Sequence, residues 1–214
     1  MPNILNPELE SYLHRLENTV PRSETLQTME TYAKEKSFPI VGPLVGRMMA
    51  TVALSIGAKR VLELGSGFGY SAIWFAWAIG RNGSIVCTDG DEKNRGMAQE
   101  NFRNAKVSTP IEFKVGDALS ISRTLSGPFD IVFCDIDKHE YPDAIDEAAR
   151  LLHPDGVFFT DNTLWSAKIV DVSITDKYTE GVREFNRRLF TDRRFSSTIL
   201  PIRDGVAMAV KIGQ

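Results

Sequence analysis

The stretch RVLELGSGFGYS, residues 60–71, decides the fold class of this chain. It begins with the short apolar run RVLEL, continues through a loop rich in glycine, and ends on Gly69-Tyr70-Ser71, where we expect a helix to begin. Closely spaced glycines let a backbone turn tightly and approach a ligand, because no Cβ stands in the way. The pattern predicts a nucleoside-binding strand, loop and helix. A glycine turn that serves only strand–helix packing is the alternative interpretation.

Downstream of this stretch, short apolar runs alternate with amphipathic segments, which is typical of a parallel sheet with crossover helices. The runs are RVLEL (60–64), SIVCT (84–88), IEFKV (111–115), FDIVFCD (129–135) and GVFFT (156–160). A helix is predicted near 180–190, and the runs FSSTILPI and GVAMAVKI then flank Arg203-Asp204-Gly205, whose last two residues favour a hairpin turn. We therefore expect a doubly wound α/β sheet that ends in an antiparallel hairpin. In such sheets ligands bind at the carboxyl ends of the strands.

Upstream of residue 59 the sequence is helical in character. Apolar positions at three-to-four spacing predict helices over 7–20, 23–36 and 43–56, with Ser23 as an N-cap and Pro43 in a first turn. These extra N-terminal helices, residues 1–58, are expected to pack on a Rossmann-like core of residues 59–214. Since 214 residues with 43% hydrophobic content suit one core, we expect a single domain over 1–214.

Composition restricts the partners and the location. The formal net charge is −3 and the pI is near 5.7, so no overall cationic field favours nucleic acid. The N-terminus lacks the pattern of a signal peptide, and no apolar run approaches the roughly 20 residues that a membrane helix needs. Cys87 and Cys134 lie in β-like runs and are predicted to be buried thiols, which fits a cytoplasmic location. His14, His139 and His153 are scattered and are predicted to be surface residues.

Acidic residues after the first strands suit a nucleoside ligand. Glu63 places a carboxylate at a buried strand end, where it needs a cationic or hydrogen-bonding partner. Asp89 follows the second strand at the spacing of a ribose ligand, whereas Asp91 and Glu92 are better explained as charges at a helix N-terminus. Asp117, before Ala118, is expected either to contact adenine or to cap the following helix.

The fourth and fifth runs end in oxygen ligands of the kind that a hard cation prefers. Asp135 follows one run, and Asp161 with Asn162 follows the next. Adjacent parallel strands bring their carboxyl ends together, so these three side chains are predicted to offer oxygens to one cation, with Mg²⁺ first and Mn²⁺ or Ca²⁺ as alternatives. Helix caps and turn formers would explain Asp161 and Asn162 alone, but they explain all three residues less well.

At this point the motifs resemble those of the cation-dependent class I O-methyltransferases, which include caffeoyl-CoA and catechol O-methyltransferases. The resemblance runs from about residue 38 to the C-terminus and is carried by LELGSGFGYS (62–71), FDIVFCDIDKHEY (129–141), DNTLW (161–165), REFNRRLFTDRRF (183–195) and ILPIRDGVAMAVK (199–211). It implies a seven-stranded sheet, S-adenosylmethionine as the methyl donor, and often a homodimer. The implied cofactor residues are Val41, Glu63, Gly65, Tyr70, Ser71, Asp89 and Ala118, to which we add Asp117 and Asp135.

The resemblance also implies the chemistry. Asp135, Asp161 and Asn162 look like metal ligands, and Lys138 falls where the family places its general base; a surface ion pair of Lys138 with Asp137 or Glu140 is the alternative. The expected substrate is a small hydroxylated aromatic, either catechol-like or a phenylpropanoid CoA ester. Free catechol is less favoured, because the stretch Ser196-Ser197-Thr198 lacks a late carboxylate found in the catechol enzymes. Residues 166–180 are expected to form a lid over the substrate.

Three other functions stay open at this level. A tRNA hydroxyuridine methyltransferase of the same fold would need a phosphate-facing patch, for which arginines at 183, 187, 188, 193 and 194 are candidates. At helical spacing, however, arginines are more often a solvated face. A non-catalytic adenosyl-binding module would be expected to lack Lys138 or the metal ligands. An NAD-dependent dehydrogenase would leave the converging oxygen ligands unexplained.

Overall fold

The computed structural model describes residues 6–20 and 23–213. The predicted N-terminal helical region and the chain end include residues 1–5, 21–22 and 214, which lie outside the described residues. The first three helices are α1 (Pro7–Thr19), α2 (Glu24–Lys36) and α3 (Gly42–Ser55). As predicted, Ser23 caps α2 by accepting from the Thr25 N–H, and Pro43 lies in the first turn of α3.

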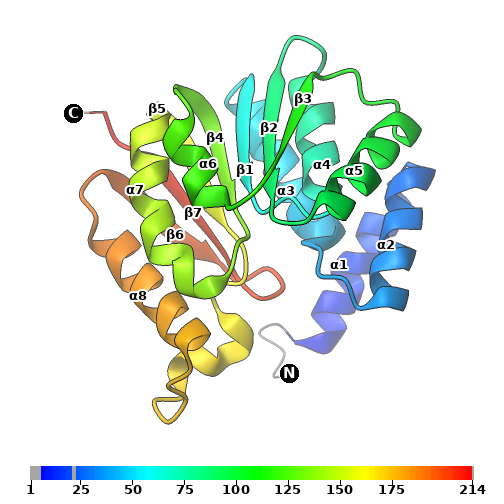
Figure 1. Cartoon of the computed structure of the whole chain (residues 1–214). Helices are drawn as coiled ribbons and strands as arrows, with labels where there is room; N and C mark the ends of the chain where they lie inside the picture. Colours follow the sequence, from blue (N-terminus) through cyan, green and yellow to red (C-terminus); the bar gives the residue numbers. More distant parts are fainter. Residues whose placement is uncertain (1–5, 21–22, 214) are drawn as a thin grey trace.

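A seven-stranded sheet forms the centre of the molecule, in the order β3-β2-β1-β4-β5-β7-β6 (Figure 1). The strands are β1 (Arg60–Leu64), β2 (Ser84–Asp89), β3 (Ile111–Val115), β4 (Phe129–Cys134), β5 (Leu152–Thr160), β6 (Phe195–Leu200) and β7 (Val206–Lys211). The first five are parallel, and β7 runs antiparallel to both β5 and β6. The predicted fold class, including the antiparallel C-terminal pair, is confirmed.

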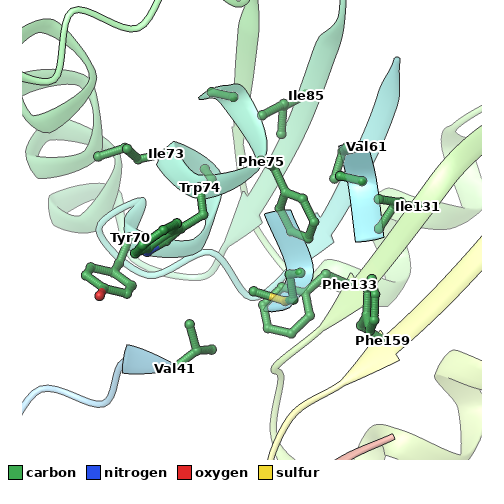
Figure 2. Packing of buried hydrophobic residues seen from close by; sticks show 14 of the residues in the cluster. Val41, Val61, Tyr70, Ile73, Trp74, Phe75, Ile85, Ile131, Phe133 and Phe159 are labelled. Carbon is green, nitrogen blue, oxygen red and sulfur yellow. The ribbon is translucent and has the colours of Figure 1, made fainter. Parts of the chain in front are cut away.

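Helices cover both faces of the sheet. They are α4 (Tyr70–Ile79), α5 (Glu92–Asn104), α6 (Ala118–Thr124), α7 (Tyr141–Leu151) and α8 (Lys177–Thr191), with short 3₁₀ segments η1 (Lys138–Glu140) and η2 (Trp165–Val170). Alternate residues of the parallel strands serve two separate cores, because successive side chains point to opposite faces. Val61 packs with α3 and α4 in the core of Figure 2, whereas Leu62 packs with α6 to α8. Both strand faces are therefore buried.

The order of the strands creates a place for a ligand. The chain passes from β1 outward through β2 to β3, and then returns to place β4 on the other side of β1. Loops that leave β1 and β4 therefore diverge, and such a switch point opens a crevice at the carboxyl ends of the strands. The loop after β1 carries Gly65, and the loop after β4 carries Asp135, so both predicted functional segments reach this crevice.

The amino end of the sheet is closed by polar contacts. Asp130 accepts from the backbone N–H groups of Lys59 (2.7 Å) and Arg60 (2.6 Å), and its other oxygen lies 2.8 Å from His153 Nε2. His153 is therefore a half-buried partner of Asp130 rather than only the predicted surface residue. Burial alone would raise the pKa of Asp130, but the two N–H groups and His153 outweigh it and hold this pKa below its ordinary value.

Two predicted boundaries differ from the structure. Strand β5 begins at Leu152, ahead of the predicted Gly156, because Phe129 of β4 pairs with Leu152 before a register shift. Helix α8 begins at Lys177, so the end of the predicted lid, residues 166–180, is helical. The side chain of Asp176 causes the early start, since it accepts from the N–H groups of Tyr178 and Thr179.

Two further predictions concern the cysteines and membrane-spanning helices. Cys87 and Cys134 are both fully buried free thiols, as expected. Within residues 6–20 and 23–213, none of the helices combines the length and apolar character that crossing a bilayer requires.

Candidate active site

Three cavities meet at the carboxyl end of the sheet, and Asp135 and Pro39 line all of them. The largest, of about 870 Å³, lies between the strand ends and the N-terminal helices and is called the outer cavity here. A cavity of about 640 Å³ lies over the loops after β2, β3 and β4, and one of about 140 Å³ lies against the glycine loop. Ligands bound in neighbouring cavities would therefore come close to one another at Asp135.

The two cavities near the glycine loop collect most of the predicted cofactor residues. The 140 Å³ cavity is lined by Val41, Gly65, Tyr70, Ser71, Asp89 and Asp135, among others. The 640 Å³ cavity is lined by Gly65, Asp89, Asp117, Ala118 and Asp135, among others. Gly65 has a φ of +85°, and a Cβ at this position would collide with the carbonyl group of Asp135. Only glycine therefore allows the loops after β1 and β4 to approach this closely.

Asp89 and Asp117 are fixed by backbone groups. Asp89 Oδ2 accepts from the Gly67 N–H (3.0 Å), and its Oδ1 accepts from the Asp91 N–H (2.9 Å) and the Asn94 side chain (2.8 Å). These contacts hold the carboxylate at the rim of both cavities. Asp117 caps α6 by accepting from the Ser120 N–H (2.7 Å), so the capping alternative is correct, and the residue also lines the 640 Å³ cavity.

Glu63 differs from the other predicted cofactor residues. It is completely buried beneath the glycine loop and does not appear among the residues that line the three cavities. Its Oε1 has no hydrogen-bond partner among the described residues. Burial raises the pKa of Glu63 to about 7, although the Ser66 and Ser71 hydroxyls and the Cys87 thiol oppose this shift. Its direct contact with a cofactor stays a prediction.

The three predicted metal ligands all line the outer cavity. Asp161 is 2% exposed, and its Oδ1 lacks a partner among the described residues. Burial, followed by repulsion from Asp135, raises the pKa of Asp161. Asn162 adopts a left-handed backbone with φ of +56°, and its side chain partly opposes the rise that burial causes in the pKa of Asp204. A buried carboxylate oxygen without a partner is costly, and a cation would relieve that cost.

The residues therefore fit a hard cation in donor type and in electrostatics. Two carboxylates and one amide oxygen are the ligands that Mg²⁺ accepts while it keeps water or substrate oxygens. No cluster of three His, Cys, Asp or Glu side chains suited to a metal occurs in the part of the chain that the structure describes. The third predicted ligand here is an asparagine, which such a cluster would not include.

Lys138 lies beside Asp135 rather than Asp137 or Glu140. Its Nζ donates to Asp135 Oδ1 (2.8 Å), and it lies 4.9 Å from the ring centre of Tyr141 and 5.9 Å from that of Trp165. The side chain is 12% exposed and lines the 640 Å³ cavity, so it faces the same space as Asp135 and Asn162. The alternative of a solvated surface ion pair does not describe this position.

Tyr141 and Gly181 hold this segment in place. Burial raises the pKa of Tyr141 well above its ordinary value, and repulsion from Asp135 adds to the effect, so the phenol remains a donor. It donates to the Asp161 carbonyl (2.9 Å) and lies 3.5 Å from Asp135 Oδ1. Gly181 of α8 lies so close that a Cβ there would collide with the Lys138 carbonyl. Sequence reasoning had given neither residue a role.

Arg183 organises the predicted lid. Its guanidinium donates to the main-chain carbonyls of Lys168, Ile169, Asp171 and Ile174, and it also pairs with Glu180. At the start of the same segment, Trp165 Nε1 donates to Thr179 Oγ1 (3.2 Å). Helix α8 therefore fixes this segment, which begins next to Trp165, and the Trp165 ring centre lies 5.9 Å from Lys138 Nζ.

The other arginines of the proposed phosphate-facing patch mostly have acidic partners. Arg187 pairs with Glu184, and Arg188 and Arg194 both pair with Asp146. Arg183 is engaged by the lid, so Arg193 is the one arginine of this set without an ion pair among the described residues. The arginines do not form a set of unpaired charges.

Several residues of the outer cavity were not predicted from sequence. His14, Lys34 and Arg203 contribute positive or titratable groups, and Glu30 contributes a carboxylate that accepts from the Tyr70 hydroxyl (2.8 Å). They come from α1, α2 and the β6–β7 turn, which are far apart in the sequence. His14 had been predicted to be a surface residue, but it is half-buried at this cavity. Only the helix and hairpin patterns hinted at these segments, and neither pattern locates a pocket.

Comparison with known proteins agrees with this geometry. The sequence profile of the O-methyltransferase family matches residues 8–212. A catechol O-methyltransferase from Niastella koreensis is 33% identical over 179 residues, covering 79% of this chain and 81% of that protein. Caffeoyl-CoA O-methyltransferase 2 from Zea mays is 31% identical over 179 residues, covering 78% of this chain and 68% of that protein. The crystal structure of TomG from Streptomyces achromogenes, an O-methyltransferase involved in tomaymycin synthesis and solved in complex with SAM, has a TM-score of 0.87 and 28% identity, covering 100% of both chains.

Proposed function

This chain belongs to the O-methyltransferase family, and from that premise we propose that it transfers a methyl group from S-adenosylmethionine to a hydroxyl of a small aromatic molecule, with a divalent cation as helper. The resemblance inferred from the motifs is thereby confirmed at the level of the family. The observation that carries the proposal is the convergence of the three cavities on Asp135, beside a buried Asp161 oxygen that lacks a partner. This arrangement provides separate space for a nucleoside, a methyl donor and an acceptor.

The cofactor is expected to occupy the two cavities near the glycine loop. Asp89 would accept hydrogen bonds from the ribose hydroxyls, because a carboxylate offers acceptor sites beyond those used by its three present donors. Ala118 and Asp117 line the space for the adenine. The methionine part would extend along Val41 and Tyr70 toward Asp135, where the transferable methyl would meet the outer cavity.

Methyl transfer from a sulfonium is an in-line displacement, so it depends on holding the acceptor oxygen close to the methyl group and at the right angle. Asp135, Asp161 and Asn162 would hold the cation, which, when bound, favours ionisation of the acceptor hydroxyl and orients it. Lys138 in its neutral amine form would accept the hydroxyl proton at Nζ and become an ammonium beside Asp135. Trp165 and the lid that Arg183 fixes would keep water from this space.

Among substrates of the same fold, tRNA is the weaker candidate. The arginines at positions 183, 187, 188 and 194 already bind carbonyl or carboxylate groups of the chain, which leaves little charge to neutralise a phosphate backbone. We propose Mg²⁺ as the cation, with Mn²⁺ or Ca²⁺ as substitutes, because the donor set is entirely oxygen.

A second copy of the chain is the proposed protein partner. Helix α1 exposes Leu9, Tyr12 and Leu16, each between 45% and 49% exposed, at intervals that place them along one side of the helix, and Val20 just after the helix is 40% exposed. An apolar stripe of this kind is typical of an interface. The two buried free thiols fit the reducing cytoplasm that we propose as the location.

The proposed reaction can be tested with labelled S-adenosylmethionine and a panel of hydroxylated aromatics, their CoA esters and tRNA, each with Mg²⁺ and with a chelator. We expect label in an aromatic acceptor that depends on the added cation. Transfer that is unaffected by the chelator would contradict the role of the cation, and transfer only to tRNA would contradict the class of acceptor. Light scattering of the same preparation would test the dimer.

A further inference from the structure

The outer cavity is not uniformly charged. Its carboxylates Asp135 and Asp161 come from the strand ends, where the proposed reaction takes place. The groups that face them from other elements are cationic or titratable: Arg203 from the β6–β7 turn, Lys34 from the last turn of α2, and His14 from α1. The third carboxylate of the lining, Glu30, accepts from the Tyr70 hydroxyl (2.8 Å). The cavity is therefore acidic where the strand ends line it and cationic where α2 and the β6–β7 turn line it.

Arg203 lines the outer cavity from a left-handed backbone conformation. Its φ is +51°, a conformation that is uncommon outside glycine and whose cost often marks a functional position. Nη1 donates to the Ile40 carbonyl (2.8 Å), and the side chain passes over Gly42, with Cδ 3.6 Å from the place that a Cβ would occupy. A guanidinium carries five N–H donors, so this single bond leaves donors for a ligand.

Arg203 also lines the same cavity as Asp135 and Asp161, where the proposed reaction takes place. Lys34 is exposed at the C-terminus of α2 and adds a second positive charge to the lining. A ligand that places a hydroxyl near Asp135 and Asp161 would thus present its remaining substituents to Arg203 and Lys34. The planar fork of a guanidinium matches the geometry of a carboxylate, and an ammonium adds a point charge.

We propose that the acceptor is an aromatic acid, a hydroxylated ring that also carries a free carboxylate, and that Arg203 and Lys34 bind this carboxylate while His14 borders it. This inference rests on the proposed function and specifies its substrate class. It makes Arg203 and Lys34 specificity residues that distinguish an acid from a neutral ring of equal size. The apolar rim formed by Phe38 and Pro39 would contact the ring itself.

A matched pair of acceptors tests the inference. We would compare kcat/KM for 3,4-dihydroxybenzoate and 3,4-dihydroxybenzamide, which share the ring and hydroxyls and differ in charge, with caffeoyl-CoA as a third acceptor. We expect the chain to prefer the acid over the amide by at least tenfold, and the preference to shrink as salt is added, because exposed charges are screened. Arg203→Met should bring the preference close to parity, mainly through KM for the acid, and Lys34→Met should reduce it severalfold.

Control measurements separate a local effect from a general one. Lys36→Met removes an exposed lysine from the same helix without touching the outer cavity, so it should leave the preference unchanged. Binding of S-adenosylhomocysteine to Arg203→Met should be unaltered, which shows that the variant is folded. If that variant fails to fold, Lys34→Met alone decides whether the preference depends on the charges of the cavity.

The outcomes distinguish the inference from the proposed function. Methylation of the acid and amide with equal kcat/KM would overturn the carboxylate site and leave the aromatic acceptor intact. A clear preference for caffeoyl-CoA over the acid, lost in the Lys34 variant, would assign these cations to phosphates instead and would also overturn it. If none of the three acceptors is methylated in the presence of Mg²⁺, the proposed acceptor class fails, and the inference fails with it.

Discussion

The carboxylates at the two ends of the sheet differ in how well their oxygens are paired. At the amino end, Asp130 uses both oxygens on Lys59, Arg60 and His153, and its pKa is held below the ordinary value. At the carboxyl end, Glu63 and Asp161 each keep an oxygen without a partner among the described residues, and burial raises the pKa of both. Carboxylate oxygens are therefore paired at the amino end of the sheet and partly unpaired at its carboxyl end.

This difference indicates that ligand-binding groups at the carboxyl end lower the stability of the ligand-free fold. A carboxylate with satisfied acceptors stabilises the fold, whereas a buried oxygen without a partner destabilises it until a ligand arrives. Changes at the amino end should therefore alter stability and spare turnover. At the carboxyl end, loss of a group that binds ligand should lower turnover, and removal of a buried, unpaired charge should raise stability. Four variants test this contrast.

The largest effect is expected from Asp161→Ala, which removes the unpaired carboxylate. We expect cation-dependent turnover to fall by more than about a thousandfold, because the barrier rises when the acceptor hydroxyl is no longer oriented and ionised. Affinity for S-adenosylhomocysteine should stay largely intact, since Asp161 does not line the cofactor cavities. Calorimetry and turnover at a series of Mg²⁺ concentrations provide the measurement; equal loss of cofactor affinity and activity would contradict the assignment.

A smaller effect is expected from Lys138→Ala. Turnover at neutral pH should fall by about a hundredfold, within the usual range for the loss of an acid–base group. Activity should partly recover at higher pH, where the phenol ionises without help. A pH profile of kcat for the variant and for Lys93→Ala, an exposed lysine of α5, would check this. If the profile of Lys138→Ala matches that of the wild type, the residue has no role as the base.

Glu63→Gln should change stability in a way that depends on pH. The pKa of Glu63 lies near 7 in the folded state and near 4.5 in the unfolded state, so the wild type loses stability as pH rises from 4.5 to 7. The glutamine variant does not titrate there, and it should gain on the order of 2 kcal/mol relative to the wild type by pH 8. Denaturant unfolding of the ligand-free proteins at pH 5 and pH 8 measures this difference; a constant offset would be inconsistent with a buried, titrating Glu63.

The smallest effect is expected at the amino end of the sheet. Asp130→Asn weakens the contacts with Lys59, Arg60 and His153 and should cost about 1 kcal/mol at pH 7. Because the folded pKa of Asp130 is lowered, its contribution is present above the unfolded value and disappears as pH falls through the folded one. Turnover should match that of Glu100→Gln, an exposed acid-to-amide control on α5. A loss of turnover larger than the loss of stability would remove the contrast between the two ends.

Much of this fold could be predicted because strand and helix periods are local signals. The apolar runs at 60–64 and 111–115 match β1 and β3, and the Ser23 and Pro43 signals mark where α2 and α3 begin. Strand β5 was underestimated, since His153, Pro154 and Asp155 are typical of a loop. Its early start depends on the Asp130 contact and on Lys211, which donates to the Leu152 carbonyl, and such long-range contacts leave no periodic pattern.

The candidate site was predictable only where it follows the strand ends. Asp135, Asp161 and Asn162 share one cavity because parallel strands end together, which the sequence order implies. Arg203 and Lys34 line the same cavity because a hairpin turn packs near an N-terminal helix. No residue spacing in the sequence predicts that these two elements lie close together. Glu63 is completely buried and does not line the three cavities, so its contact with a cofactor stays a prediction.

The contacts of Arg183 have a consequence for how this chain tolerates substitution. The four lid groups that Arg183 holds are main-chain oxygens, which every residue type carries. Side chains in residues 168–174 can therefore be exchanged while the path of the segment is preserved. Such a segment can be grafted or randomised as a cassette, and we regard it as the natural starting point for changing acceptor selectivity by directed evolution.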